Sequence, residues 1–177
     1  MNSLEGLIKK QNRRDNMDDI TAYCKDNKVI KIFLGKKDIF LEKENSEEKL
    51  KKQGIIRNEN LEKLLKKSFI GEDIDFSEYV DLNLLGVTDF EKKVYIETMK
   101  IPKGQVKTYK EIGEAIETKG YRAVGNALNK NPIAIIVPCH RVIGSNMTLT
   151  GFRGGLDMKK EMLNNEGIKV KKEKVIK

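Results

Sequence analysis

Residues 108–130, TYKEIGEAIETKGYRAVGNALNK, have the pattern of two short helices joined by a tight turn. Thr108 and Glu111 have the spacing of a capping box, which predicts that a helix begins here. A break at Gly120 leads into a second helical segment, 121–130, whose small residues allow close approach. The pair is a helix-turn-helix candidate, although any antiparallel helix pair in a core has the same pattern.

The next segment, NPIAIIVPCHRV at 131–142, places two reactive side chains after a proline. Its apolar run, 133–137, predicts a buried strand or extended segment that Pro138 ends or bends. Adjacent side chains in a strand point to opposite faces, so Cys139 and His140 can lie on one side only in a turn. We therefore expect a turn after the proline.

A cysteine beside the only histidine of the chain indicates nucleophilic chemistry. The thiolate is the nucleophile, and an imidazole can take the thiol proton if a third group orients the ring. Glu166, Glu161 and Asp157 are the downstream candidates for that group. The alternative is that Cys139 is a small core hydrophobe and His140 a satisfied polar residue.

Upstream, the alternation of 20–24 and 29–35 around a polar turn predicts a small antiparallel meander, which DIFLEK at 38–43 extends. The second strand is expected to place three apolar side chains on one face: Ile30, Ile32 and Leu34. Helices are then predicted at 45–53, 60–69 and 90–100, with an acidic linker over 71–85.

Composition limits the classes of protein to consider. The chain has 177 residues, 38% of them hydrophobic, and a net charge of +8. It has no apolar stretch of membrane-spanning length, and its start lacks the apolar block of a secretory signal, so we expect a cytoplasmic protein without membrane contact. Cys24, Cys139 and one histidine cannot supply four zinc ligands without carboxylates, and a disulfide is disfavoured in the cytoplasm. No metal is expected, and Cys24 is predicted to be a core residue.

The excess positive charge lies in the second half. Residues 1–88 are neutral overall, whereas 103–153 carry +5 and 168–177 carry +4. This distribution fits either a solubility bias or a surface that binds nucleic acid.

Four segments resemble, in order, the C-terminal domain of the O6-alkylguanine-DNA alkyltransferases (methylated-DNA protein-cysteine methyltransferases). The most specific is Pro-Cys-His-Arg, with Arg-Ala-Val-Gly upstream and Glu-Gly downstream. The resemblance covers 87–167, and the N-terminal half matches only in its broad plan. The four segments are 101–116, 121–132, 135–144 and 149–167.

The resemblance implies irreversible transfer of an alkyl group from guanine O6 to Cys139, once per molecule and without a cofactor. It makes His140 the partner of the cysteine, joined through an ordered water to a carboxylate at Glu166. Tyr109 would disturb the target phosphate, bind the flipped base and donate a proton as guanine leaves. Asn131 would brace the turn that carries the cysteine.

The implied partner is double-stranded DNA with an O6-alkylguanine lesion, and the second helix of the pair would lie in the minor groove. Arg122 would enter the base stack as the guanine is extruded. The base pocket would comprise the backbone at Val142 with Phe152 and Arg153, which stand where many relatives have Tyr-Ser. The implied DNA contacts are Arg122, Tyr109, Thr108, Ala123, Gly125, Arg141 and Arg153.

The expected fold is α/β of the α+β kind. A sheet-plus-helix domain at 1–86, with a ragged terminus at 1–19, would precede a mostly helical, winged helix-turn-helix-like domain at 87–177 that ends in a basic tail, 168–177. The protein is expected to be a monomer. Two other functions stay open: a winged-helix protein that binds lesions without transfer, and a Cys-His hydrolase.

Overall fold

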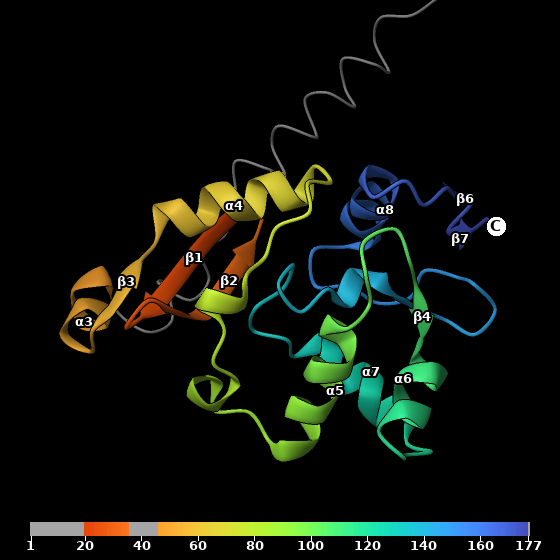
Figure 1. The fold of residues 1–177 in the computed structure, drawn as a ribbon, viewed down its shortest axis with the longest axis horizontal. Coiled ribbons are helices and arrows are strands. Elements are labelled where there is room, and N and C mark those ends of the chain that lie inside the picture. The colour runs from red at the N-terminus through yellow and green to blue at the C-terminus, as the bar shows by residue number, and fades with distance from the viewer. Residues whose placement is uncertain (1–19, 36–45, 177) are drawn as a thin grey trace, which may run out of the picture.

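The computed structural model describes residues 20–35 and 46–176, and it has the predicted mixture of a small antiparallel sheet with helices (Figure 1). Within these residues, no helix is both long and apolar enough to cross a bilayer. The elements of the first half are β1 (Ile20–Lys25), β2 (Lys28–Leu34), α3 (Ser46–Lys52), β3 (Ile55–Arg57), α4 (Glu59–Phe69), η1 (Ser77–Tyr79) and η2 (Leu82–Leu85). The elements of the second half are α5 (Asp89–Met99), β4 (Lys107–Thr108), α6 (Tyr109–Ala115), α7 (Tyr121–Asn129), η3 (Cys139–Arg141), β5 (Val142–Ile143), α8 (Leu156–Asn165), β6 (Val170–Lys171) and β7 (Lys174–Val175).

The N-terminal sheet has the strand order β2-β1-β3, and both pairings are antiparallel. The expected face of β2 is wrong in part. A bulge opposite Tyr23 and Cys24 leaves Ile30 without a partner in the register, so that Val29 and Ile32 are both buried against the core. A strict two-residue alternation cannot anticipate this shift.

A strand that the sequence did not predict completes the part of the sheet that the structure describes. β3 follows α3 and pairs with β1, whereas the predicted segment 38–43 lies outside the described residues, as does the ragged terminus, 1–19. With three residues, β3 is too short for the alternation of polar and apolar side chains to reveal it.

Helix α4 covers the sheet with an apolar stripe at helical spacing. Asn58 caps the helix by accepting a hydrogen bond from the backbone N–H of Leu61. Leu61, Leu65 and Phe69 follow at four-residue intervals, and each is at most 1% exposed. Burial of each of these side chains stabilises the fold by about 1.5–3 kcal/mol.

The predicted helix-turn-helix is α6 and α7, which lie side by side in the lower right of Figure 1. The capping box forms as expected, because Thr108 Oγ1 accepts from the Glu111 N–H and the Glu111 carboxylate accepts from the Thr108 N–H. Gly113 permits the tight crossing: a Cβ at this position would lie 2.7 Å from the ring of Tyr121. Helix α5 has a second capping box at Thr88 and packs beside the pair.

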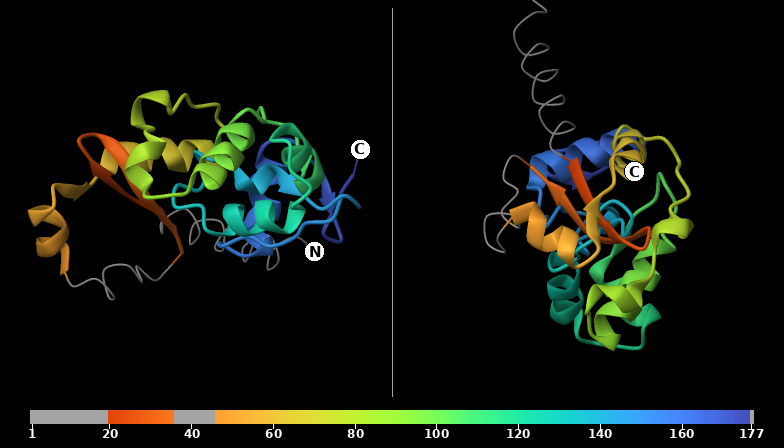
Figure 2. Two further views of the ribbon diagram at one scale, coloured as in Figure 1. Left: turned by 90° about the horizontal axis from the view of Figure 1, so that it is seen from below. Right: turned by 90° about the vertical axis from the view of Figure 1, so that its left-hand side faces the viewer.

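The two halves share one hydrophobic core that crosses the predicted boundary at residue 86. Figure 2 shows the sheet and the helix-turn-helix on opposite sides of the molecule, and buried residues of both belong to this core. The backbone N–H of Ile32 donates to the Pro132 carbonyl at 2.8 Å, and the Asn165 amide donates to the Phe69 carbonyl at 2.8 Å. Gly71, at φ +95°, packs so closely on the Asn165 backbone that a Cβ would overlap it. The expected linker over 71–85 is mostly irregular, with two 3₁₀ turns.

Candidate active site

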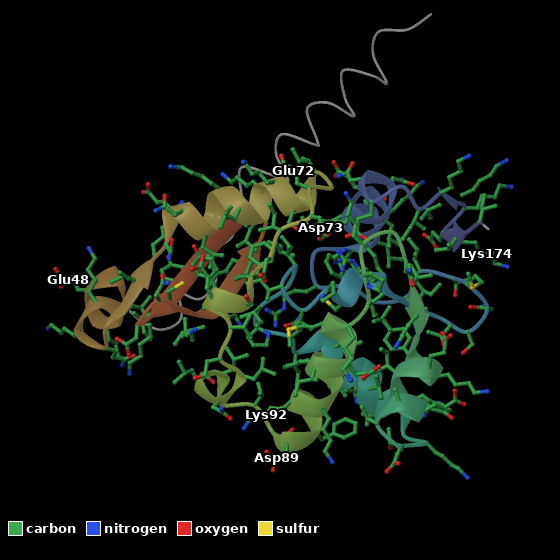
Figure 3. The ribbon with its side chains drawn as sticks, viewed as in Figure 1. Glu48, Glu72, Asp73, Asp89, Lys92 and Lys174 are labelled. Carbon is green, nitrogen blue, oxygen red and sulfur yellow. The ribbon has the colours of Figure 1, made fainter. Side chains whose placement is uncertain are left out.

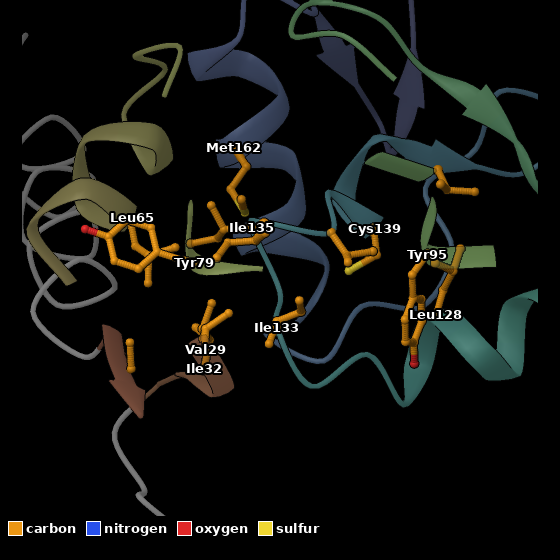
Figure 4. Packing of buried hydrophobic residues seen from close by; sticks show 14 of the residues in the cluster. Val29, Ile32, Leu65, Tyr79, Tyr95, Leu128, Ile133, Ile135, Cys139 and Met162 are labelled. Carbon is orange, nitrogen blue, oxygen red and sulfur yellow. The ribbon is translucent and has the colours of Figure 1, made fainter. Parts of the chain in front are cut away.

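The segment that carries the cysteine is a compact series of turns rather than the predicted strand. Residues 133–137 are all buried, but they form a bridge between Ala134 and Val137 and a left-handed turn at Ile135, φ +78°. A β-branched residue in that conformation is strained and is held there by the packing around it. The turn expected after Pro138 is present as η3, which places Cys139 at the edge of the core beside Tyr95 and Leu128 (Figure 4).

Asn131 fastens this segment at both ends. Its Oδ1 accepts from the Ile133 N–H at 3.0 Å, while its Nδ2 donates to the Val137 carbonyl at 3.0 Å and to Cys139 Sγ at 3.4 Å. Because the amide is 2% exposed, water does not compete for these hydrogen bonds. The placement fits the bracing role expected for Asn131.

Burial raises the pKa of the Cys139 thiol, and the Asn131 hydrogen bond and the positive charges of Lys159 and Arg153 offset only part of that effect. The cysteine is 8% exposed, yet it lines an open cavity. At neutral pH Cys139 is therefore a protonated thiol, and a base must remove its proton before it can react.

A chain of polar groups lies behind the cysteine. His140 Nε2 is 2.8 Å from Glu166 Oε1, a direct hydrogen bond, so no water stands between these two groups as the resemblance had suggested. Of the three carboxylates considered, Glu166 is the one that meets the histidine, and Asp157 is exposed on α8. His140 Nδ1 is buried, with no hydrogen-bond partner among the described protein groups.

Arg141 completes the chain from the other side. Its Nε and Nη2 donate to the Glu166 carboxylate at 2.8–3.1 Å, and its Nη1 donates to the Ile101 carbonyl at 2.7 Å. This placement does not support the DNA contact expected for Arg141, because its donors are engaged inside the protein. Arg141 instead lines a second cavity, between the linker and η3, away from the first.

The charges of this chain are set by its hydrogen bonds. Burial alone would raise the pKa of Glu166, but the hydrogen bonds from His140 and Arg141 outweigh burial and lower the pKa to about 2. Burial lowers the pKa of His140, although Glu166 opposes the shift. At neutral pH Glu166 is thus ionised and His140 neutral. The Glu166 carboxylate accepts a hydrogen bond from Nε2–H, which leaves the Nδ1 lone pair as a base.

These shifts predict that acid destabilises the fold. A carboxyl whose pKa is lower in the folded state stabilises above its unfolded pKa, near 4.5, and that contribution is lost as pH falls from 4.5 towards 2. The expected loss is on the order of 3 kcal/mol. Protonation of buried His140 acts in the same direction below pH 6.5. Urea unfolding between pH 7 and pH 2 measures the effect. An equally steep loss in Glu166→Gln would contradict the assignment to Glu166.

The cavity in front of the cysteine has a volume of about 400 Å³ and brings together six of the expected site residues. Thr150, Gly151 and Asn126, which the sequence did not single out, also line it. Thr108, Ala123 and Val142 do not line the cavity; Val142 is buried, and its carbonyl accepts from Lys159 Nζ. The expected residues in the lining are Tyr109, Arg122, Gly125, Cys139, Phe152 and Arg153.

One side of the cavity is held by Lys159, which the sequence analysis missed. Its side chain is fully buried in α8, and its Nζ donates to the carbonyls of Val142 at 2.6 Å and Thr150 at 2.8 Å. Burial lowers the pKa of Lys159 to about 8. The Tyr109 hydroxyl reaches the same Thr150 carbonyl at 3.4 Å. A signal was present, because Lys159 has helical spacing with Leu156 and Leu163 on an apolar face.

No group of three or more His, Cys, Asp or Glu side chains is placed to hold a metal ion in the part of the chain that the structure describes. The arrangement is instead that of a single nucleophile at the base of a cavity. Behind it stands a base oriented by a carboxylate, and helix α7 borders the opening.

Comparisons with known proteins agree with this geometry. Residues 89–168 match the family model of the 6-O-methylguanine DNA methyltransferase DNA-binding domain. A methylated-DNA–protein-cysteine methyltransferase of Sulfolobus acidocaldarius is 45% identical over 102 residues, which are 58% of this chain and 63% of that protein. The chain spans 51–63% of the length of the first curated relatives that it matches.

Solved structures extend the likeness to the N-terminal half. The O6-methylguanine-DNA methyltransferase of Pyrococcus kodakaraensis is 32% identical, with a TM-score of 0.64, over 84% of this chain and 91% of that one. Mycobacterium tuberculosis OGT in complex with DNA is 44% identical, with a TM-score of 0.53, over 58% of this chain and 62% of that one. The likeness thus extends into both halves, and the chain belongs to the O6-methylguanine-DNA methyltransferase family.

Proposed function

We propose that this protein repairs DNA by moving an alkyl group from the O6 atom of guanine to Cys139. The observation that carries the proposal is the cavity of about 400 Å³ with Cys139 in its lining and a neutral, oriented histidine behind it. That volume is in the range of pockets that enclose small ligands. The proposal also agrees with the DNA-bound relative.

In the proposed reaction the Cys139 proton passes to His140 Nδ1, and Glu166 stabilises the imidazolium that forms. We propose that a water carries this proton from sulfur to Nδ1, which has no hydrogen-bond partner among the described protein groups. The thiolate attacks the alkyl carbon, so that an S–C bond forms as the C–O6 bond breaks. The guanine leaves with the bond's electron pair and takes a proton from the Tyr109 hydroxyl. The thioether has no proton to lose and is stable, so each molecule acts once.

The DNA must present the base outside the stack, since an alkyl group on a paired guanine is out of reach. Helix α7 exposes Arg122 and Ala123 beside the cavity, and Gly125 leaves room next to the Tyr109 ring. We propose that α7 binds the minor groove and that Arg122 fills the place of the extruded base. Phe152 and Arg153 form part of the wall of the base pocket. The protein acts as a monomer.

The number of lesions removed per protein molecule distinguishes alkyl transfer from lesion binding without transfer. Duplex DNA that contains O6-methylguanine is mixed with increasing amounts of protein, and the remaining lesion is measured at completion. We expect one lesion removed per protein molecule. A hydrolase would remove many lesions per molecule, and a protein that only binds the lesion would remove none; either outcome would refute the proposal.

Replacement of Arg122 by Ala tests the extrusion step. Unstacking costs a few kcal/mol, and each 1.4 kcal/mol is a factor of ten, so we expect transfer from duplex DNA to slow by roughly 10- to 100-fold at saturating DNA. Reaction with free O6-benzylguanine should be unchanged. Lys119→Ala removes an exposed charge from the preceding turn and serves as the control. Equal loss on both substrates in Arg122→Ala would contradict the role.

A further inference from the structure

The basic tail folds into an ordered element that the sequence did not predict. β6 and β7 form a two-stranded hairpin at the end of the molecule opposite the N-terminal sheet (Figure 1). We call residues 169–175 the lysine hairpin; the segment contains four lysines and one glutamate. Val170 and Val175 face each other across the strands and pack on a small apolar cluster around Ile143, Leu149 and Leu163.

The lysine hairpin is joined to the loop that forms the cavity rim. The Leu149 N–H donates to the Glu173 carbonyl at 2.7 Å, and the Val175 N–H donates to the Met147 carbonyl at 2.9 Å. A bridge between Thr148 and Lys174 lies between these hydrogen bonds, so 147–149 acts as a third strand beside β7. The next residues along this loop, 150–153, line the cavity.

The lysine side chains of the lysine hairpin do not stabilise its fold. Lys171 and Lys174 are exposed and directly opposite each other, a like-charge pairing that destabilises a hairpin. The turn places Lys172 and Glu173 at φ +46° and +58°, where Asn-Gly would be favourable. Such departures from local preference are expected where a surface is used for binding. Figure 3 shows Lys174 at the outer edge of the molecule.

We infer that the lysine hairpin binds the phosphate backbone of duplex DNA beside the lesion and so fixes the cavity rim against the DNA. The inference rests on the proposed function and adds a second DNA-binding element to α7. Three exposed cations on strands and turn, Lys171, Lys172 and Lys174, supply the charge, and the paired strand 147–149 connects them to the rim. Thr150 follows directly on the strand 147–149 that pairs with the hairpin, so a DNA contact at the hairpin orients the cavity rim at Thr150.

The test replaces Lys171, Lys172 and Lys174 by Gln together. Each phosphate contact contributes about 0.9 to the slope of log K against log salt, so we expect the slope for duplex DNA to fall by about 2 to 3. The melting temperature should stay the same or rise, because a like-charge pair is removed. Reaction with free O6-benzylguanine should be unchanged.

A matched control replaces three exposed N-terminal lysines, Lys51, Lys63 and Lys67, by Gln, which removes the same charge. The slope of this control should equal that of the unmodified protein. Equal slopes for the hairpin variant and the unmodified protein would overturn the inference and leave the proposed function standing. Equal losses in both triple variants would also overturn it, since net charge alone would then explain binding. If the unmodified protein removes no lesion from duplex DNA, the proposed function itself fails.

Discussion

Replacement of Cys139 by Ser is expected to abolish alkyl transfer while leaving DNA binding intact. A serine hydroxyl is far less acidic than a thiol, so His140, whose pKa burial lowers, cannot generate the alkoxide. Removal of the nucleophile costs roughly 10⁶-fold in serine hydrolases, and we expect transfer to fall below detection. Affinity for duplex DNA should change little, because Arg122 and the lysine hairpin are untouched.

The control for this variant is Cys24→Ala. Cys24 is 1% exposed within the sheet and takes part in the N-terminal core, so its replacement should lower stability but preserve one transfer per folded molecule. Gel-shift binding and loss of the lesion from DNA are measured for both variants. Residual transfer in Cys139→Ser would place the acceptor elsewhere.

Replacement of Glu166 by Gln is expected to damage both stability and chemistry. Arg141 would keep its buried charge without a carboxylate, at a cost of about 3–5 kcal/mol. His140 would lose the group that sets its tautomer and stabilises the imidazolium, which predicts a rate loss of roughly 10²- to 10⁴-fold. Thermal unfolding and single-turnover transfer measure the two effects.

A second variant separates these effects. Glu166→Gln combined with Arg141→Met removes the unpaired charge, so stability should recover in part while transfer stays slow. Asp157→Asn changes an exposed carboxylate of α8 and should alter neither quantity. Recovery of the rate together with stability would show that Glu166 acts only on folding.

Local signals explain which parts of the fold could be predicted. Thr108 and Glu111 form a capping box within one turn of helix, and such contacts depend little on the rest of the chain. The apolar run 133–137 was misassigned because burial looks alike in a strand and in packed turns, and only the tertiary contacts of Asn131 select the turns. The lysine hairpin was missed because its turn lacks Asn-Gly and its pairing strand, 147–149, is distant in sequence.

The residues of the site also fall into those that the sequence reveals and those that only the fold reveals. Cys139 and His140 were recognisable because they are adjacent in sequence and follow a proline. The helical spacing of Lys159 indicates that it faces the core, but its carbonyl partner at Val142 and the carboxylate partner of Arg141 depend on how α8 packs, which no local pattern encodes. Arg and Lys usually lie on the surface, but Arg141 and Lys159 make their hydrogen bonds inside the protein.

The central claim is that Cys139 accepts the alkyl group. The measurement that tests it most directly is incubation of the unmodified protein with duplex DNA containing O6-methylguanine, followed by intact-protein mass and peptide mapping. We predict that one methyl group replaces one hydrogen in every reacted molecule, on the peptide that contains Cys139. A protein of unchanged mass after loss of the lesion, or a methyl group on Cys24, would contradict the account.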